Sequence, residues 1–84
     1  MDYTARTPEQ LGQILKACRN RRGLTQQETA KKVGLKQATV SSAENDSSAT
    51  SVETLYKLVS ALGLELVLRD PTVPLGVADA PREW

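Results

Sequence analysis

The sequence contains no histidine and no phenylalanine, and it holds a single cysteine. Without histidine there is no imidazole for acid–base catalysis, and the chain shows neither a glycine-rich phosphate loop nor a cluster of metal-ligating residues. A single cysteine also rules out an intramolecular disulfide framework. We therefore expect no enzymatic activity, no metal ion and no cofactor.

Aromatic residues are scarce as well, at 4% of 84 residues, so the core must be thin and aliphatic. The lone cysteine belongs to an apolar series with helical spacing, which predicts a small buried side chain rather than a reactive thiol. The members of this series are Leu11, Ile14, Leu15 and Cys18. The N-terminus is polar and no long apolar run follows it, so we expect no signal peptide, no membrane span and a cytoplasmic location.

The net charge is only +1, but the charges are unevenly distributed. Residues 1–45 carry eight cations and four acids, a balance of +4, whereas residues 46–84 carry three cations and six acids, a balance of −3. A positive half of this kind can attract phosphates, and the alternative is an ordinary solvated charged surface.

The segment TQQETAKKVGLKQATVSSAEN in the positive half has the spacing of a helix-turn-helix. Thr25 is a natural N-cap, and Glu28 completes a capping box for a helix over residues 26–32. Gly34 suits the turn that follows, because glycine adopts positive φ without strain. A second helix is expected over residues 37–44.

The outward face of the second helix carries amides, hydroxyls and one cation, which suits the reading of base edges in the major groove. Lysine can donate to guanine, glutamine can bond bidentately to adenine, alanine can contact a thymine methyl, and serine can make a short hydroxyl contact. We predict base contacts from Lys36, Gln37, Ala38 and Ser41. We predict phosphate contacts from Thr25, Gln26, Thr39, Arg22, Lys16 and Lys32. For the three cations, the alternative is an ordinary surface position.

The flanking segments complete a small domain over residues 7–69, preceded by a loose arm at residues 1–6. A first helix should start at the Thr7 cap and reach about Asn20. After a polar loop, Thr50 or Ser51 should cap a last helix that ends at Gly63. The inner stripe of this last helix is predicted to comprise Val52, Leu55, Leu58, Val59 and Leu62.

The apolar residues beyond Gly63 alternate with a period of two, which predicts a single strand. Since a lone strand cannot satisfy its own backbone, its expected partner is the same strand of a second subunit in a two-fold dimer. The alternative is that this segment packs on its own core as extended chain. The residues assigned to the dimer strand are Leu64, Leu66, Val67 and Leu68.

Residues 70–84 hold three prolines and one glycine, and no periodic pattern survives there. Such a composition predicts a flexible tail. The chain ends on its single tryptophan, Trp84, which is either incidental or an anchor for a pocket on a partner protein.

The helix-turn-helix segment resembles the Xre/Cro/phage-repressor family, whose members are bundles of about five helices that bind operators as dimers. The residues that carry the resemblance are Thr25-Gln26, Glu28, Ala30, Gly34, Val40 and Glu44-Asn45. Thr29 stands where the family usually has leucine, and Ala43 stands where a bulky aliphatic is usual, so the core beneath the motif should be thinner. The resemblance implies a mainly α, lambda-repressor-like helix-turn-helix bundle.

A narrower resemblance links the stretch GLKQATVSSAEN, the predicted C-terminal strand and the terminal Glu83-Trp84 to the HipB-type antitoxins. In that family, the strand forms an intersubunit two-stranded sheet, the dimer represses its own operon, and the C-terminal tryptophan engages a HipA-type kinase toxin. The resemblance implies a homodimer that binds palindromic double-stranded operator DNA and a HipA-type kinase toxin. It implies no membrane partner and a nucleoid-associated location in the cytoplasm. The tail also resembles a degradation signal. The alternatives are a stand-alone Xre-family repressor without a toxin, and a protein-interaction module that no longer binds DNA.

Overall fold

The computed structural model describes residues 1–72, so most of the predicted tail, including Trp84, lies outside the described residues. Within that range the chain forms α1 (Pro8–Arg21), α2 (Gln26–Lys32), α3 (Gln37–Asn45), the 3-10 turn η1 (Ser47–Ala49) and α4 (Val52–Ala61). The predicted mainly α helix-turn-helix bundle is confirmed, and the predicted helix boundaries agree to within about one residue.

Side-chain caps fix where α1 and α4 begin. Thr7 Oγ1 accepts from the Gln10 backbone N–H at 3.1 Å. The Gln10 side chain accepts from the Arg6 N–H at 2.7 Å, one residue before the cap itself. At α4, the cap is Ser51 rather than Thr50, and its hydroxyl accepts from the Thr54 N–H at 3.1 Å.

The crossing of α1 with α3 depends on Gly12. A Cβ atom at this position would lie 2.6 Å from the carbonyl oxygens of both Ala43 and Glu44, closer than real Cβ contacts allow. The absence of a side chain on α1 therefore lets the α3 backbone approach directly. Ala43 is fully buried at this contact, so its small side chain belongs to a closely packed crossing.

The core is aliphatic, as its sequence predicts, and it is drawn from all four α-helices. Its buried members are Leu15, Cys18, Ala30, Val40, Ala43, Leu58 and Leu62. Cys18 has no exposed surface, which confirms the prediction of a small buried side chain. The buried Thr29 donates its hydroxyl to the Thr25 carbonyl at 3.0 Å, so a polar side chain in a usual leucine position is satisfied within its own helix.

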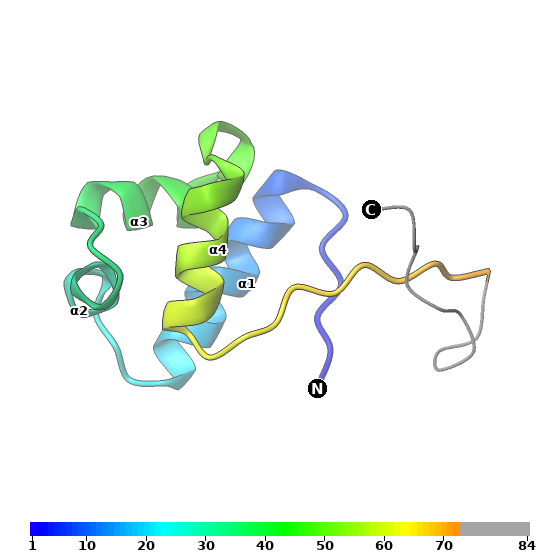
Figure 1. The fold of residues 1–84 in the computed structure, drawn as a ribbon, viewed down its shortest axis with the longest axis horizontal. Helices are drawn as coiled ribbons and strands as arrows, with labels where there is room; N and C mark the ends of the chain where they lie inside the picture. The colour runs from blue at the N-terminus through cyan, green and yellow to red at the C-terminus, as the bar shows by residue number, and fades with distance from the viewer. Residues whose placement is uncertain (73–84) are drawn as a thin grey trace.

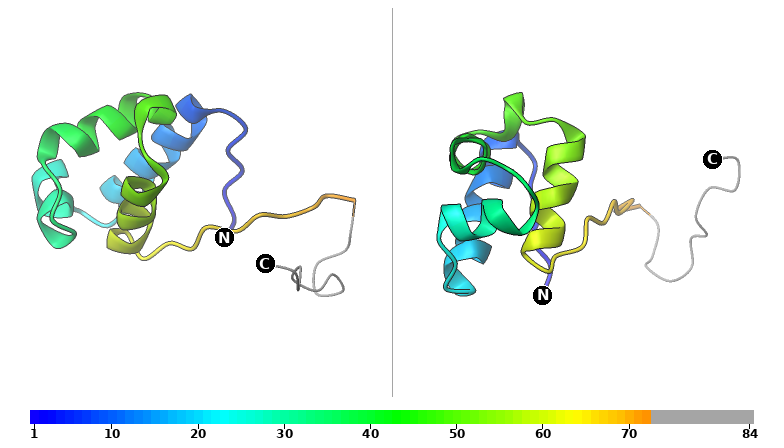
Figure 2. Two further views of the ribbon diagram at one scale, coloured as in Figure 1. Left: turned by 45° about the horizontal axis from the view of Figure 1, so that its top comes forward. Right: turned by 60° about the vertical axis from the view of Figure 1, so that its left-hand side comes forward.

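The bundle separates the helix pair from the C-terminal segment. α2 and the start of α3 lie on one side of the bundle, and residues 64–72 run from the end of α4 toward the other side (Figures 1 and 2). The N-terminal arm lies on the side of the C-terminal segment (Figure 1), and Arg21 Nη1 in the last turn of α1 donates a hydrogen bond to the Tyr3 hydroxyl. None of the helices within residues 1–72 is long and apolar enough to span a membrane.

Two features of the predicted C-terminal half differ in the structure. Val52 is 67% exposed, so its assignment to the inner stripe of α4 was wrong: it lies in the first turn, ahead of the buried part of the helix. The single chain shows no strand among its described residues, because a β-ladder needs a second strand that one chain does not supply. Leu64 packs against the core instead, while Leu68 is 93% exposed.

Candidate nucleic-acid interface

The start of α2 is closed by a reciprocal capping box. The Thr25 hydroxyl accepts from the Glu28 N–H at 3.0 Å, and the Glu28 carboxylate accepts from the Thr25 N–H at 2.8 Å. The backbone N–H of Thr25, which donates to the carboxylate, is the main cause of a lowered pKa of the exposed Glu28 carboxyl, and the neighbouring Thr25 hydroxyl adds to it. The box confirms Thr25 as the predicted N-cap, and Gln26 is the first residue of the helix.

The start of α3 is built differently. Lys36 occupies the N-cap position and its side chain makes no capping hydrogen bond. Lys36, Gln37 and Ala38 are exposed, and Ser41 is half-buried on the same helix. Three of the predicted base-reading side chains, Lys36, Gln37 and Ala38, therefore lie exposed at the start of α3, and Ser41 follows one turn later.

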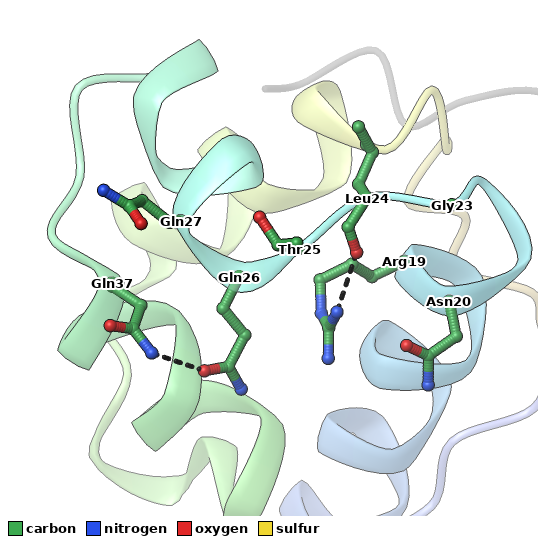
Figure 3. Close-up of a pocket in the computed structure, with 8 residues that line it drawn as sticks. All are labelled: Arg19, Asn20, Gly23, Leu24, Thr25, Gln26, Gln27 and Gln37. Carbon is green, nitrogen blue, oxygen red and sulfur yellow. Dashed lines mark hydrogen bonds between the residues drawn. The ribbon is translucent and has the colours of Figure 1, made fainter.

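A shallow hollow joins the starts of the two helices with the end of α1 (Figure 3). It is lined by Arg19, Asn20, Gly23, Leu24, Thr25, Gln26, Gln27 and Gln37. The hollow brings the predicted base reader Gln37 beside the predicted phosphate contacts Thr25 and Gln26. Gln37 Nε2 donates to Gln26 Oε1 at 3.0 Å across the gap between α3 and α2.

The other predicted phosphate contacts lie elsewhere. Thr39 lines a second hollow between α3 and the start of α4. The Arg22 guanidinium lies beside Gly63 at the end of α4: a Cβ atom built at Gly63 would be 3.6 Å from Arg22 Nη2. Lys16 and Lys32 are exposed and line neither hollow.

A buried ion pair beneath the hollow was missed by the sequence analysis. Arg19 Nε donates to Glu44 Oε2 at 2.6 Å and Arg19 Nη2 donates to Glu44 Oε1 at 3.1 Å, with the two residues only 8% and 5% exposed. The hydrogen bond to Glu44 raises the pKa of Arg19 despite the opposing effect of burial. Arg19 also donates to the Leu24 carbonyl at 2.8 Å (Figure 3).

The buried role of Arg19 could not be predicted from the sequence. The partners are 25 residues apart, so no local spacing connects them, and Arg19 was counted with the cations of the positive half. Pairing withdraws one cation and one acid together, so the balance of residues 1–45 stays at +4. Within residues 1–72, no group of acidic or cysteine side chains is placed to hold a metal ion.

Comparison with known proteins gives consistent matches. A family model described as helix-turn-helix matches residues 15–68. The chain is 44% identical over 64 residues to the antitoxin HipB of Escherichia coli O6:H1, covering 76% of this chain and 68% of that protein. It is 42% identical over 64 residues to the antitoxin HipB of Escherichia coli K12, covering 76% of this chain and 73% of that protein.

Solved structures match over most of the chain. HipB in a HipA–HipB–O2–O3 complex superposes with a TM-score of 0.78 at 38% identity, covering 83% of this chain and 99% of that chain. HipB in a complex with an O4 20mer gives the same values. A restriction–modification controller protein, with a TM-score of 0.64 at 23% identity, covers 68% of this chain and 76% of that chain and shares the fold alone.

Proposed function

Because the chain belongs to the HipB antitoxins of the helix-turn-helix family, we propose that it represses its own toxin–antitoxin operon and neutralises a HipA-type kinase toxin. The observation that carries the DNA-binding part is the exposed, uncapped start of α3, joined to α2 by the Gln37–Gln26 hydrogen bond. The known HipB structures include one with HipA and one with an O4 20mer.

We propose that the start of α3 enters the major groove. Lys36 donates to guanine O6 or N7, and Gln37 bonds bidentately to adenine. Ala38 supplies a methyl contact for thymine, and Ser41 a short hydroxyl contact. The exposure of Lys36, Gln37 and Ala38 at the start of α3 supports this assignment, with Ser41 half-buried one turn later.

Phosphates on either side of the groove are the proposed partners of a second group of residues. Gln26 keeps one amide hydrogen free beyond its bond to Glu44, and Thr25 stands beside it at the hollow. Thr39 lines the neighbouring hollow, which carries several other hydroxyls. The exposed cations Lys16, Arg22 and Lys32 complete the proposed set.

A homodimer is part of the proposal. Leu66, Val67 and Leu68 are 42%, 65% and 93% exposed, and pairing of this segment with its copy in a second subunit would cover them. The segment extends away from α2 and the start of α3, so pairing along it would leave both helix pairs accessible. A two-fold dimer predicts a palindromic site with half-site centres about 34–36 Å apart, or a multiple of that.

The DNA-binding part is tested by titrating the protein, at fixed salt, with duplex DNA from upstream of its own gene. Lys36→Ala should reduce discrimination between this DNA and a scrambled duplex by about 1–3 kcal/mol. Arg22→Ala should weaken both duplexes alike, because a phosphate contact carries no base information. Full discrimination by the Lys36 variant would contradict the proposed readout.

The antitoxin part is tested by co-purification with a kinase-like protein encoded beside this gene. The full chain should retain the kinase, and a chain that ends at Asp70 should lose it if Trp84 is the anchor, as we propose. Retention by both chains would move the toxin contact onto residues 1–70. Retention by neither would favour a stand-alone repressor.

A further inference from the structure

The carboxylate of Glu44 is surrounded by hydrogen-bond donors at the base of the hollow. Arg19 donates to both of its oxygens, and Gln26 Nε2 donates to Oε1 at 3.1 Å. A guanidinium carries five donors and no acceptor, and an ionised carboxylate only accepts. At Glu44 Oε1, the atom that it contacts, Gln26 therefore meets an acceptor.

This arrangement determines the direction of the Gln26 amide. If the amide turned over, Gln26 Oε1 would face Glu44 Oε1, which places one acceptor against another. Nitrogen and oxygen of a glutamine amide have nearly the same shape, so only hydrogen bonding distinguishes the two directions. With its nitrogen held by Glu44, Gln26 presents its oxygen to α3.

The same logic extends to Gln37. The Gln26 oxygen accepts from Gln37 Nε2 at 3.0 Å, which uses one of the two amide hydrogens of Gln37. The second amide hydrogen and Gln37 Oε1 remain for the DNA. These are a donor and an acceptor, the combination that matches N7 and the N6 amino group of adenine.

We propose that Arg19 and Glu44 are positioning residues for base recognition: acting through Gln26, they fix the direction in which Gln37 presents its amide to DNA. This inference rests on the proposed DNA-binding function. Without the carboxylate, the Gln26 amide has no preferred direction, and a reversed Gln26 would turn a donor toward Gln37. Gln37 would then present its amide in either direction, and its preference for one base would fall while the phosphate contacts persist.

The test uses selection from duplex DNA with randomised half-sites, followed by sequencing of the bound fraction. Gln37→Ala first identifies the base-pair position that Gln37 reads. The double variant R19M/E44M then replaces the buried ion pair by apolar side chains of similar volume, a change that buried pairs often tolerate. The matched control is E53M/K57M, which makes the same exchange at an exposed pair on α4 whose Lys57 Nζ–Glu53 Oε1 distance is 3.7 Å.

We expect R19M/E44M to lower the preference at the Gln37 position by about fivefold or more, in line with the loss of one bidentate contact. Preference at the Lys36 position should stay, and the control should keep the whole pattern. Retention of the Gln37 preference by the folded double variant would overturn the inference, as would an equal loss at every position. A wild-type protein that selects no sequence would refute the proposed function itself.

A second variant decides the matter if circular dichroism shows that R19M/E44M does not fold. Gln26→Met leaves the ion pair in place and removes the amide that connects it to Gln37. It also removes the phosphate contact proposed for Gln26, which should weaken binding to all sequences alike. Selective loss at the Gln37 position supports the inference. An unchanged preference at that position overturns it, because no other side chain links Glu44 to Gln37 in the described residues.

Discussion

The two helices of the motif are held at opposite ends. α2 is fixed at its start, where the Thr25–Glu28 box satisfies two backbone N–H groups. α3 has no side-chain cap at its start and is instead held near its end, where Glu44 pairs with Arg19 of α1. The difference shows how one helix can serve as a support while its neighbour keeps a free end for a ligand.

The largest effect should follow from breaking the fixed end of α3. Glu44→Ala leaves the Arg19 guanidinium buried without its carboxylate, and removal of one partner of a buried pair costs about 3–5 kcal/mol. Urea denaturation measures the change in free energy of unfolding. Glu53→Ala, at the exposed pair on α4, is the control and should change it little. A similarly small change for Glu44→Ala would mean that α3 is not held at its end.

Removal of the cap on α2 should have the next largest effect. Thr25→Ala deletes the hydroxyl that accepts from the Glu28 N–H, and loss of an N-cap costs about 0.5–2 kcal/mol. Thermal and urea unfolding measure this loss. Thr25→Ser, which keeps the hydroxyl, should remain close to the wild type. An Ala variant as stable as the Ser variant would show that the hydroxyl cap does not stabilise the start of α2.

Adding a cap to α3 tests the same difference between the capped start of α2 and the uncapped start of α3. Lys36→Ser places a hydroxyl at an N-cap position that has no side-chain hydrogen bond, and it should raise the free energy of unfolding by about 0.5–1 kcal/mol. The same variant should lose the preference for the base that Lys36 reads. Lys36→Ala, which lacks both groups, should lose the preference without the gain. A Ser variant no more stable than the Ala variant would show that the start of α3 cannot accept a cap.

The smallest effect concerns acid pH. The pKa of Glu28 lies below its ordinary value, so its contribution to stability is complete above about pH 4.5 and falls as the pH drops through the lowered pKa. Glu28→Gln does not titrate and should lack this part of the acid sensitivity. Unfolding curves at a series of pH values compare the two proteins. If the free energy of unfolding of the wild type and of Glu28→Gln fell equally at acid pH, the acid sensitivity would belong to other carboxyl groups.

Local patterns were enough to place the helices. Thr7, Thr25 and Gly34 mark helix ends through their own hydrogen bonds or backbone conformation, which depend on residues only a few positions away. The same reasoning failed for Val52, because a helical stripe does not show where the core ends. It also left open which residue capped α4, since Thr50 and Ser51 both carry a suitable hydroxyl.

Local sequence patterns predicted only part of the candidate site. The exposed residues of α3 follow from helical periodicity, so the exposure of Lys36 and Gln37 could be predicted. The Arg19–Glu44 pair joins α1 to α3 across 25 residues, and the Gln26–Gln37 bond joins α2 to α3. Contacts of this kind depend on how the helices cross, which composition and spacing do not determine.

The contact at Gly12 has a consequence for how this protein can vary. The atoms that a Cβ would meet are backbone carbonyl oxygens, which are present whatever side chains stand at positions 43 and 44. No second substitution at those positions can make room for a larger residue at position 12. Among related sequences, position 12 should therefore be restricted without covarying with the residues it touches, and methods that detect contacts from correlated substitutions would overlook this crossing.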